Sequence, residues 1–417
     1  MEKIIVHGGS RLYGKTRLKG AKNSILPLLA GAILTKDKVV LRDCPDITDI
    51  ANMLEILKIL GVEAERNGDT VTVSGGVKET EIPTELAKAI RSSIFLMGSL
   101  LATAKSARVA YPGGCDIGLR PIDIHLKGLR ELNIEIDEQS GYINCRAERI
   151  IGADVQLDKI SVGATENIMM AAVLAEGNTV IRNAAKEPEI GDLADMLNKM
   201  GAKIRGAGTS LIEIEGVSGL HGTEHTPIPD RIVAGTLMTG VALAGGEIEI
   251  ENVIPEHIAA VTSKLSKSAC NIRCFCDRIL ISGYMRSKAV DIETSPYPAF
   301  PTDMQAQMMA LLTVSQGTGL IIENIFETRF KHVPELKRMG ADITVRGDMA
   351  IVRGVRNLNG AEVLATDLRG GSALVLAGLR AKGVTVIDDV YHIDRGYERL
   401  DKILLKLGAK IERKEYE

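Results

Sequence analysis

A cysteine on a glycine-rich turn is the residue of this 417-residue chain best suited to reactive chemistry. Cys115 stands in the segment YPGGCDIGLR, where Pro and Gly leave the backbone open and Arg120 follows five residues later. A reactive thiol needs an accessible, electropositive setting, and arginine can hold an anion by two parallel hydrogen bonds. The segment predicts a reactive thiol beside an anion site, but a surface cysteine in a hairpin loop explains these residues equally well.

Further charged residues recur at two positions along the chain. The first position precedes apolar, helix-like stretches, where free backbone N–H groups and the helix dipole favour anions. The second follows the next strand-like run, and Cys115 lies at this position on the most glycine-rich turn. Loops are commonly polar, so each charge alone could be surface. The residues that together favour a site are Lys22, Arg91, Arg120, Asp303, Arg369 and Arg395.

The elements that must position these residues repeat six times, about every 70 residues. Each repeat reads β-α-β-α-β-β, with an Ala/Leu/Met-rich first helix, a second helix and a closing strand pair. The first helices are apolar nearly all round and should be buried. A left-handed helix cap is expected after each second helix. The aligned cap positions are Gly61, Asn133, Gly201, Asn271, Gly340 and Gly408.

The six repeats are expected to form two lobes of three. The polar segment HGTEHTPIP, residues 221–229, follows the third repeat and carries two prolines, which is typical of a domain junction. Domain interfaces are favoured ligand sites, so we expect a ligand cleft between the lobes.

Composition excludes several classes of function. A net charge of −3 provides no general attraction to nucleic acid or to anionic membranes. The N-terminus has no signal-peptide pattern and the apolar stretches are short, which predicts a cytoplasmic protein without membrane insertion. Cys270, Cys274 and Cys276 lack zinc-site spacing and a nearby histidine, so we expect structural cysteines and no metal. No nucleotide-cofactor motif occurs, and no cofactor is expected.

Several long segments resemble the UDP-N-acetylglucosamine 1-carboxyvinyltransferase family, and the resemblance runs from end to end. They include LKGAKNSILPLLAGAIL, RSSIFLMGSLLA, PGGCDIGLRPIDIHLKGL, PYPAFPTDMQAQ and DLRGGSALVLAGL. The resemblance implies an α/β fold, namely a two-lobed inside-out α/β barrel with three β-α-β-α-β-β repeats and buried helices in each lobe. It implies a first lobe of residues 20–227 and a second lobe of residues 1–19 with 228–417.

The resemblance also implies a reaction. Enolpyruvate passes from phosphoenolpyruvate to the 3′-hydroxyl of UDP-N-acetylglucosamine and phosphate leaves, in the first committed step of peptidoglycan precursor synthesis. Cys115 would donate the proton and react with fosfomycin, Asp303 would be the base, and Lys22 and Arg395 would complete the catalytic set. The substrate contacts implied are Lys22, Asn23, Arg91, Arg120, Pro121, Ile122, Asp123, Ile124, Lys159, Ser161, Val162, Gly163, Asp303, Ile325, Asp367 and Arg369.

Three alternatives remain at this stage, and the oligomeric state is undetermined. A regulatory paralogue with reduced catalysis could bind UDP-N-acetylglucosamine, although a pure binder needs neither acid nor base. The shikimate-pathway enolpyruvyl transferase shares the fold but is not expected to carry a loop cysteine. A thiol hydrolase would need a histidine near Cys115, and only His125 is close in sequence. Val233 and Ala299 stand where an acidic residue and a glycine are expected from the family pattern.

Overall fold

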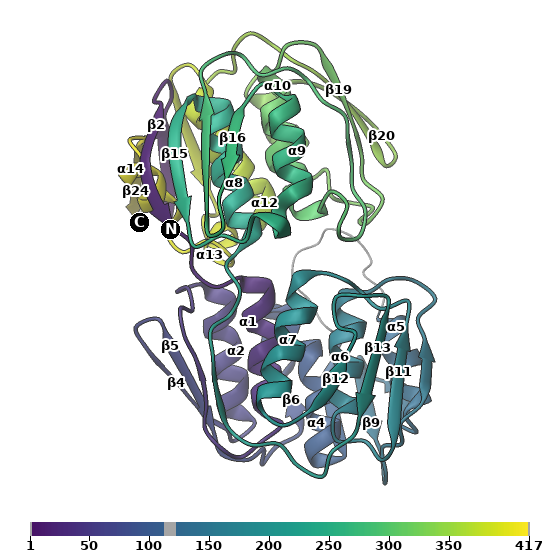
Figure 1. Ribbon diagram of the computed structural model, residues 1–417. Helices are drawn as coiled ribbons and strands as arrows, with labels where there is room; N and C mark the ends of the chain where they lie inside the picture. The colour runs from purple at the N-terminus through teal and green to yellow at the C-terminus, as the bar shows by residue number, and fades with distance from the viewer. Residues whose placement is uncertain (1, 112–121, 416–417) are drawn as a thin grey trace. The chain divides into compact units, whose positions relative to one another are not determined.

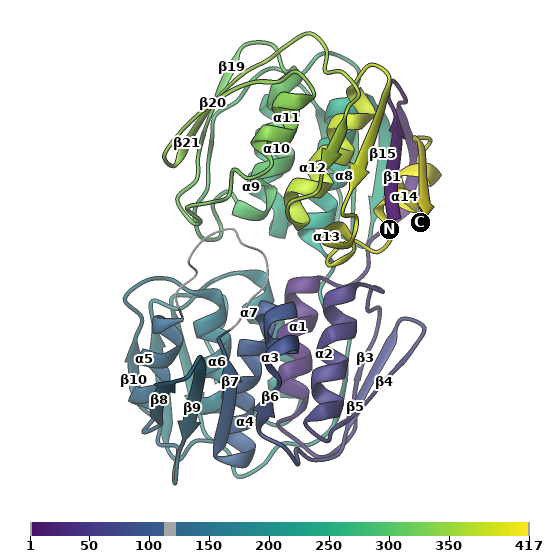
Figure 2. The same ribbon diagram turned by 180° about the vertical axis from the view of Figure 1, so that it is seen from behind.

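A computed structural model describes residues 2–111 and 122–415 of the chain (Figures 1 and 2). These residues form two compact units. The first unit comprises residues 20–111 and 122–228, and the second comprises residues 2–19 and 229–415. Cys115, Arg120 and Pro121 lie outside the described residues.

Within its described residues, each unit contains three four-stranded sheets built on one plan. In sheet order, the first two strands are parallel, and the third pairs antiparallel with both its neighbours. The first unit contains the sheets β14(Thr223–His225)-β3(Val39–Leu41)-β5(Thr70–Ser74)-β4(Glu63–Asn67), β6(Glu81–Ile82)-β7(Ser106–Ala110)-β9(Tyr142–Arg146)-β8(Glu135–Gln139) and β10(Asp154–Gln156)-β11(Asn178–Arg182)-β13(Leu211–Glu215)-β12(Lys203–Arg205). The second unit contains β2(Leu12–Arg17)-β15(Gly246–Glu251)-β17(Arg278–Gly283)-β16(Asn271–Cys274), β18(Ile292–Glu293)-β19(Thr318–Ile322)-β21(Met349–Arg353)-β20(Asp342–Arg346) and β22(Glu362–Leu364)-β23(Val384–Asp388)-β1(Glu2–His7)-β24(Lys410–Glu415).

Three strands complete sheets whose other strands lie far away in the sequence. β14 pairs with β3, whereas β1 pairs with both β23 and β24, with Ile4 opposite Ile387 and Arg413. Figure 1 shows the purple strand β2 beside the teal strand β15. The repeats are therefore not all contiguous, because the sixth has only one strand after its second helix and an N-terminal strand fills the gap.

The first helix of each repeat is buried, as its uniformly apolar sequence predicts. All ten residues of α10 (Gln305–Val314) are buried, and α10 packs against α8 (Arg231–Ala244) and α12 (Leu368–Arg380) in the second unit. In the first unit, α4 (Leu96–Ala104) packs against α1 (Lys22–Ala32) and α6 (Val162–Ala172). Helices lie inside and strands outside (Figure 1), which confirms the inside-out arrangement; the described strands form separate sheets and no closed barrel.

The second helices cover the sides of these bundles and end in left-handed caps. They are α2 (Thr48–Ile59), α5 (Asp123–Glu131), α7 (Pro188–Lys199), α9 (Ala259–Lys267), α11 (Val333–Arg338) and α14 (Leu400–Lys406). Five of the six predicted cap positions have positive φ, but Asn271 does not, and Ala269 (φ 75°) takes its place. At this helix end, Cys270 N–H donates to the Leu265 carbonyl. The equivalent hydrogen bond at the Gly61 cap runs from Val62 N–H to the Leu57 carbonyl, so Ala269 takes the place of Gly61. Shorter elements are helices α3 (Thr84–Ala89) and α13 (Tyr391–Asp394) and the 3-10 turns η1 (Arg91–Phe95), η2 (Pro255–Ile258) and η3 (Thr302–Met304).

The clustered cysteines differ in their surroundings. Cys270 is buried, and burial raises the pKa of its thiol to about 11, which fits a structural role. Cys274 and Cys276 are exposed, and Cys274 is the last residue of β16. In residues 2–111 and 122–415, no group of three His, Cys, Asp or Glu side chains is placed to hold a metal ion. Nor does any helix of these ranges have the length and apolar character needed to cross a membrane.

Candidate active site

Two arginines hold Asp303 in the second unit. Arg329 Nη2 and Arg369 Nη2 each lie 2.9 Å from one carboxylate oxygen of Asp303. Both arginine side chains are 4% exposed, whereas that of Asp303 is 23% exposed. Charge-assisted pairs of this kind stabilise an ionised carboxylate. Asp303 is therefore a partly open carboxylate that could accept a proton from a bound hydroxyl group.

Local structure explains how the cluster of Asp303, Arg329 and Arg369 is positioned. Asp303 lies in η3, directly before α10, and Arg369 is the second residue of α12. Asp367 caps α12, because its Oδ1 accepts the N–H groups of Arg369 and Gly370, each at 2.9 Å. An aspartate is among the best N-cap residues. The cap fixes the first turn of α12 and so the direction in which Arg369 leaves the helix.

A buried histidine lies beside the cluster. His332 is fully buried, and neither ring nitrogen has a hydrogen-bond partner among the described residues. Burial, opposed by the charge of Asp367 and aided by that of Arg329, lowers the pKa of His332 to about 4. The ring is therefore uncharged at neutral pH and does not compete with the arginines for Asp303.

In the first unit, Lys22 pairs with a buried aspartate. Lys22 is the first residue of α1, and its Nζ lies 2.7 Å from Asp49 Oδ2. Their side chains are 11% and 3% exposed. Asn23 follows on the exposed side of the helix. A lysine held at a helix N-terminus adds a full positive charge where backbone N–H groups already favour anions.

Arg91, His125 and the start of α6 form a second cluster in the first unit. Burial lowers the pKa of Arg91 to about 10 and that of His125 to about 3, the latter aided by the Arg91 charge. Asn167 Nδ2 lies 3.1 Å from His125 Nδ1 and donates to the Ile94 carbonyl, while Asn167 Oδ1 accepts Gly98 N–H. The amide therefore donates to Nδ1, so the imidazole proton is on Nε2.

Gly163 lies directly against this histidine. A Cβ atom at Gly163 would be 3.0 Å from a ring carbon of His125, so a larger residue would displace the ring. Ser161 caps α6, with its Oγ accepting Ala164 N–H at 3.3 Å. The structure thus brings Ser161, Val162 and Gly163 close to His125, and with it to the start of α5, where Asp123 and Ile124 lie.

A third feature of the first unit is a buried glutamate on α6. Glu166 is 1% exposed, and its Oε2 atom has no hydrogen-bond partner among the described residues. Burial raises the pKa of Glu166 well above its ordinary value, and the charges of Glu189 and Glu187 raise it further. Folded protein therefore keeps a proton on Glu166 that the unfolded chain releases.

We expect Glu166→Gln to stabilise the protein at pH 8 and not at pH 4. Stability falls as pH rises above the ordinary carboxyl pKa, because the unfolded state then binds fewer protons than the folded state. A neutral amide removes this loss, by about 1–3 kcal/mol at pH 8. Urea unfolding at both pH values tests this, with the exposed Glu65→Gln as control. An equal effect of Glu166→Gln at both pH values would contradict the assignment.

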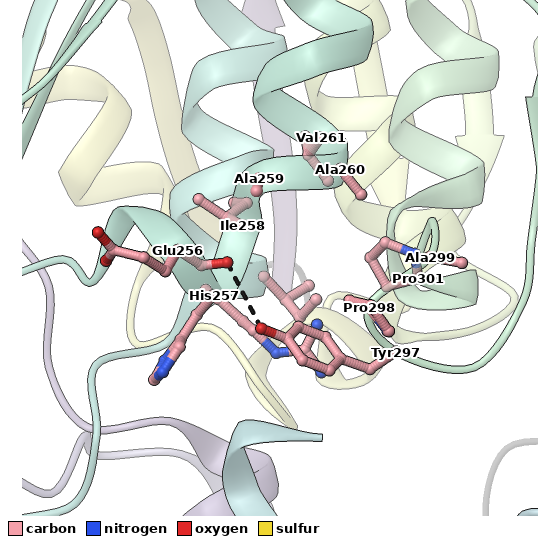
Figure 3. A pocket seen from close by; sticks show the side chains of 12 residues that line it. Glu256, His257, Ile258, Ala259, Ala260, Val261, Tyr297, Pro298, Ala299 and Pro301 are labelled. Atoms are coloured by element: carbon pink, nitrogen blue, oxygen red, sulfur yellow. Dashed lines mark hydrogen bonds between the residues drawn. The ribbon is translucent and has the colours of Figure 1, made fainter. Parts of the chain in front are cut away.

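A small hollow in the second unit has a different character (Figure 3). Ile258, Val261, Pro298 and Ala299 give it apolar walls, and Tyr297 Oη donates to the Glu256 carbonyl at 3.5 Å. Figure 3 shows the Glu256 carboxylate and the His257 ring extending away from these apolar side chains. None of the residues predicted for chemistry lines the hollow, so we place the candidate active site elsewhere.

The remaining predicted residues take various positions. Ile122 is buried before α5, Lys159 is exposed, and Arg395 is buried at the end of α13. Ile325 donates its N–H to Glu323 Oε1 at 3.0 Å. Asp303, Asp367 and Arg369 lie together in the second unit, whereas Lys22 and Arg91 belong to the first. Cys115, Arg120 and Pro121 lie outside the described residues, and their roles stay predictions.

Sequence reasoning missed the partners of the predicted residues. Arg329 is absent from the predicted set, although it binds Asp303 as closely as Arg369 does. Asp49 and His125 were not predicted as neighbours of Lys22 and Arg91. The position of Arg329 after β19, equivalent to that of Arg395 after β23, was the one signal that could have identified it.

The sequence and the fold match known enolpyruvyl transferases. The family model described as EPSP synthase (3-phosphoshikimate 1-carboxyvinyltransferase) matches residues 6–404. The solved enolpyruvyl transferase NikO from Streptomyces tendae has a TM-score of 0.90 at 25% identity, covering 100% of this chain and 99% of that one. EPSP synthase from Acinetobacter baumannii has a TM-score of 0.75 at 19% identity and covers both chains fully. The fold is therefore that of the enolpyruvyl transferases.

Relatives in sequence identify the particular family of enolpyruvyl transferases to which the chain belongs. UDP-N-acetylglucosamine 1-carboxyvinyltransferase 2 of Caldanaerobacter subterraneus subsp. tengcongensis is 53% identical, over 99% of this chain and 100% of the relative. UDP-N-acetylglucosamine 1-carboxyvinyltransferase of Myxococcus xanthus is 50% identical over 99% of each chain. The chain belongs to the UDP-N-acetylglucosamine 1-carboxyvinyltransferase family, as the sequence motifs indicate.

Proposed function

We propose that this protein transfers enolpyruvate from phosphoenolpyruvate to the 3′-hydroxyl of UDP-N-acetylglucosamine and releases phosphate. The observation that carries the proposal is the Asp303 carboxylate, held by Arg329 and Arg369 in a chain that is about half identical to named carboxyvinyltransferases. A regulatory paralogue that only binds UDP-N-acetylglucosamine would need no such base. Lys22, which pairs with Asp49, adds the cation that a phosphorylated substrate requires.

The chemistry assigns a role to each group. In the addition step, the acceptor hydroxyl oxygen bonds to C2 of phosphoenolpyruvate, Asp303 takes the hydroxyl proton and Cys115 donates a proton to the methylene carbon. In the elimination step, the C2–O bond to phosphate breaks and phosphate leaves with the electron pair and the proton from Asp303. The new methyl group returns a proton to the Cys115 thiolate, which restores the vinyl group. Lys22, Arg120 and Arg395 would neutralise the phosphate group of phosphoenolpyruvate. Arg329 and Arg369 would balance the carboxylate group of the same substrate.

We assign the nucleotide sugar to residues at the ends of three helices of the first unit. Arg91, Asp123 and Ile124, with the run from Lys159 to Gly163, would contact it, together with Ile325. Asn23, next to Lys22, would instead contact phosphoenolpyruvate. Arg120, Pro121 and Ile122 would complete this set, and Asp367 would act by orienting Arg369. We also propose that the protein acts in the cytoplasm, where phosphoenolpyruvate is available, and that it binds no nucleic acid.

The deciding assay mixes the purified full chain with phosphoenolpyruvate and UDP-N-acetylglucosamine and follows phosphate release. We expect turnover that depends on both substrates. Binding of the nucleotide sugar without phosphate release would favour the regulatory alternative. Fosfomycin should block turnover and add its mass to the Cys115 peptide, and Cys115→Asp should keep some turnover while escaping this modification. An unmodified Cys115 peptide after full exposure would oppose the assigned proton donor.

A further inference from the structure

A buried hydrogen-bond network in the second unit joins the central helices α8 and α10 to the segment that follows α13. Thr236 on α8 and Gln307 on α10 are 0% exposed, and Tyr397, which follows α13, is 1% exposed. Tyr397 Oη lies 2.8 Å from Thr236 Oγ1. Gln307 Nε2 donates to Thr236 Oγ1 at 3.1 Å and to Tyr397 Oη at 3.2 Å. Three segments distant in sequence therefore converge on one tyrosine hydroxyl.

The direction of these hydrogen bonds follows from the donors present. Thr236 Oγ1 donates its one proton to the Ile232 carbonyl at 2.8 Å. It can then only accept from Tyr397, so the Tyr397 hydroxyl is the donor in that pair. Gln307 donates to both oxygens. The hydroxyl of Tyr397 thus has its donor and acceptor functions engaged, which fixes the ring in one orientation.

Arg369 lies over the face of this fixed ring. Its guanidinium carbon is 5.4 Å from the centre of the Tyr397 ring, within the range of a cation–π contact. Arg369 Nη2 binds Asp303, but Arg369 Nε and Nη1 have no hydrogen-bond partner among the described residues. Because the ring is fixed, this contact helps to set the plane in which Arg369 presents itself to Asp303.

We propose that Tyr397 is a positioning residue for Arg369, and through it for Asp303, and that Thr236 and Gln307 hold Tyr397 in place. This inference rests on the proposed function for its kinetic consequence, because Arg369 would balance the carboxylate of phosphoenolpyruvate. The residues concerned all belong to the second unit, namely Thr236, Gln307, Tyr397, Arg369 and Asp303.

The test compares two threonines of one helix. Thr236 and Thr239 are both 0% exposed on α8, and each donates to a carbonyl one turn earlier at 2.8 Å. Only Thr236 contacts Tyr397, since Thr239 faces the sulfur of Met308 at 3.9 Å. Thr236→Val should raise KM for phosphoenolpyruvate about tenfold, the effect of one lost hydrogen bond near a charged group. Thr239→Val should leave KM unchanged.

Further readouts separate positioning from general loss of structure. KM for UDP-N-acetylglucosamine should stay within about twofold in Thr236→Val, and Thr236→Ser, which keeps the hydroxyl, should restore KM for phosphoenolpyruvate. A Thr236→Val protein with the kinetics of Thr239→Val would overturn the inference, as would an equal rise of both KM values. Crystal structures of the two valine variants add a test without substrate. Arg369 should turn from Asp303 in Thr236→Val only, so this inference can fail or hold even if wild-type protein releases no phosphate.

Discussion

Replacing Asp303 with asparagine should lower the turnover number for phosphate release by about 10²–10⁴-fold, the usual contribution of a general base. The amide has nearly the shape of the carboxylate but cannot take the proton of the acceptor hydroxyl. It also leaves Arg329 and Arg369 without the anion that each binds at 2.9 Å. Steady-state phosphate release at saturating substrate concentrations measures the effect.

The control for this variant is an aspartate with an arginine partner on the surface. Asp342 lies 3.4 Å from Arg353, and both side chains are about half exposed, at 52% and 51%. Asp342→Asn should leave turnover unchanged, because exposed ion pairs contribute little. If Asp303→Asn kept more than about a tenth of wild-type turnover, the assignment of Asp303 as base would be wrong.

Replacing Lys22 with methionine should abolish measurable turnover and also lower the free energy of unfolding by about 3–5 kcal/mol. Methionine keeps the length and packing of the side chain but removes the charge that faces Asp49 at 2.7 Å. The carboxylate of Asp49, 3% exposed, would then be buried without this cation. Chemical unfolding measures the stability change and the phosphate assay measures the turnover.

A double variant separates the two effects of Lys22. Lys22→Met combined with Asp49→Asn removes both charges, so most of the lost stability should return while turnover stays absent. Lys203→Met is the matched control, because Lys203 pairs with Glu215 on the surface and both side chains are more than half exposed. Recovery of turnover in the double variant would show that Lys22 serves only to neutralise Asp49.

Much of the fold could be predicted from local sequence. The nearly all-apolar stretch that became α10 predicted a buried helix, and alternating residues predicted the strand β21 of the same repeat. The caps at Gly61 and Gly408 were predicted because a left-handed residue at a helix end favours glycine. The prediction failed at Asn271, because Ala269 adopts the left-handed conformation without the usual glycine or asparagine signal.

The site was predictable as a set of residue types and not as a set of contacts. Family motifs named Asp303 and Arg369, whereas Arg329 and Tyr397 were identified only by their positions around them. His332 and Glu166 likewise carry no sequence signal of their burial, because polar residues are normally exposed. The roles of Cys115 and of its neighbours remain predictions.

By itself, the sequence determined the sixfold repeat, the buried helices and the polar residues at their N-termini, because periodicity and capping depend on residues close together in the chain. Tertiary structure alone decided which charges meet. The chain has 51 Lys and Arg and 54 Asp and Glu residues, and composition does not say that Lys22 faces Asp49 or that Arg369 faces Asp303, 66 residues away. Tertiary structure also places β1 between β23 and β24, because an unpaired strand edge is satisfied by whichever segment the fold brings to it.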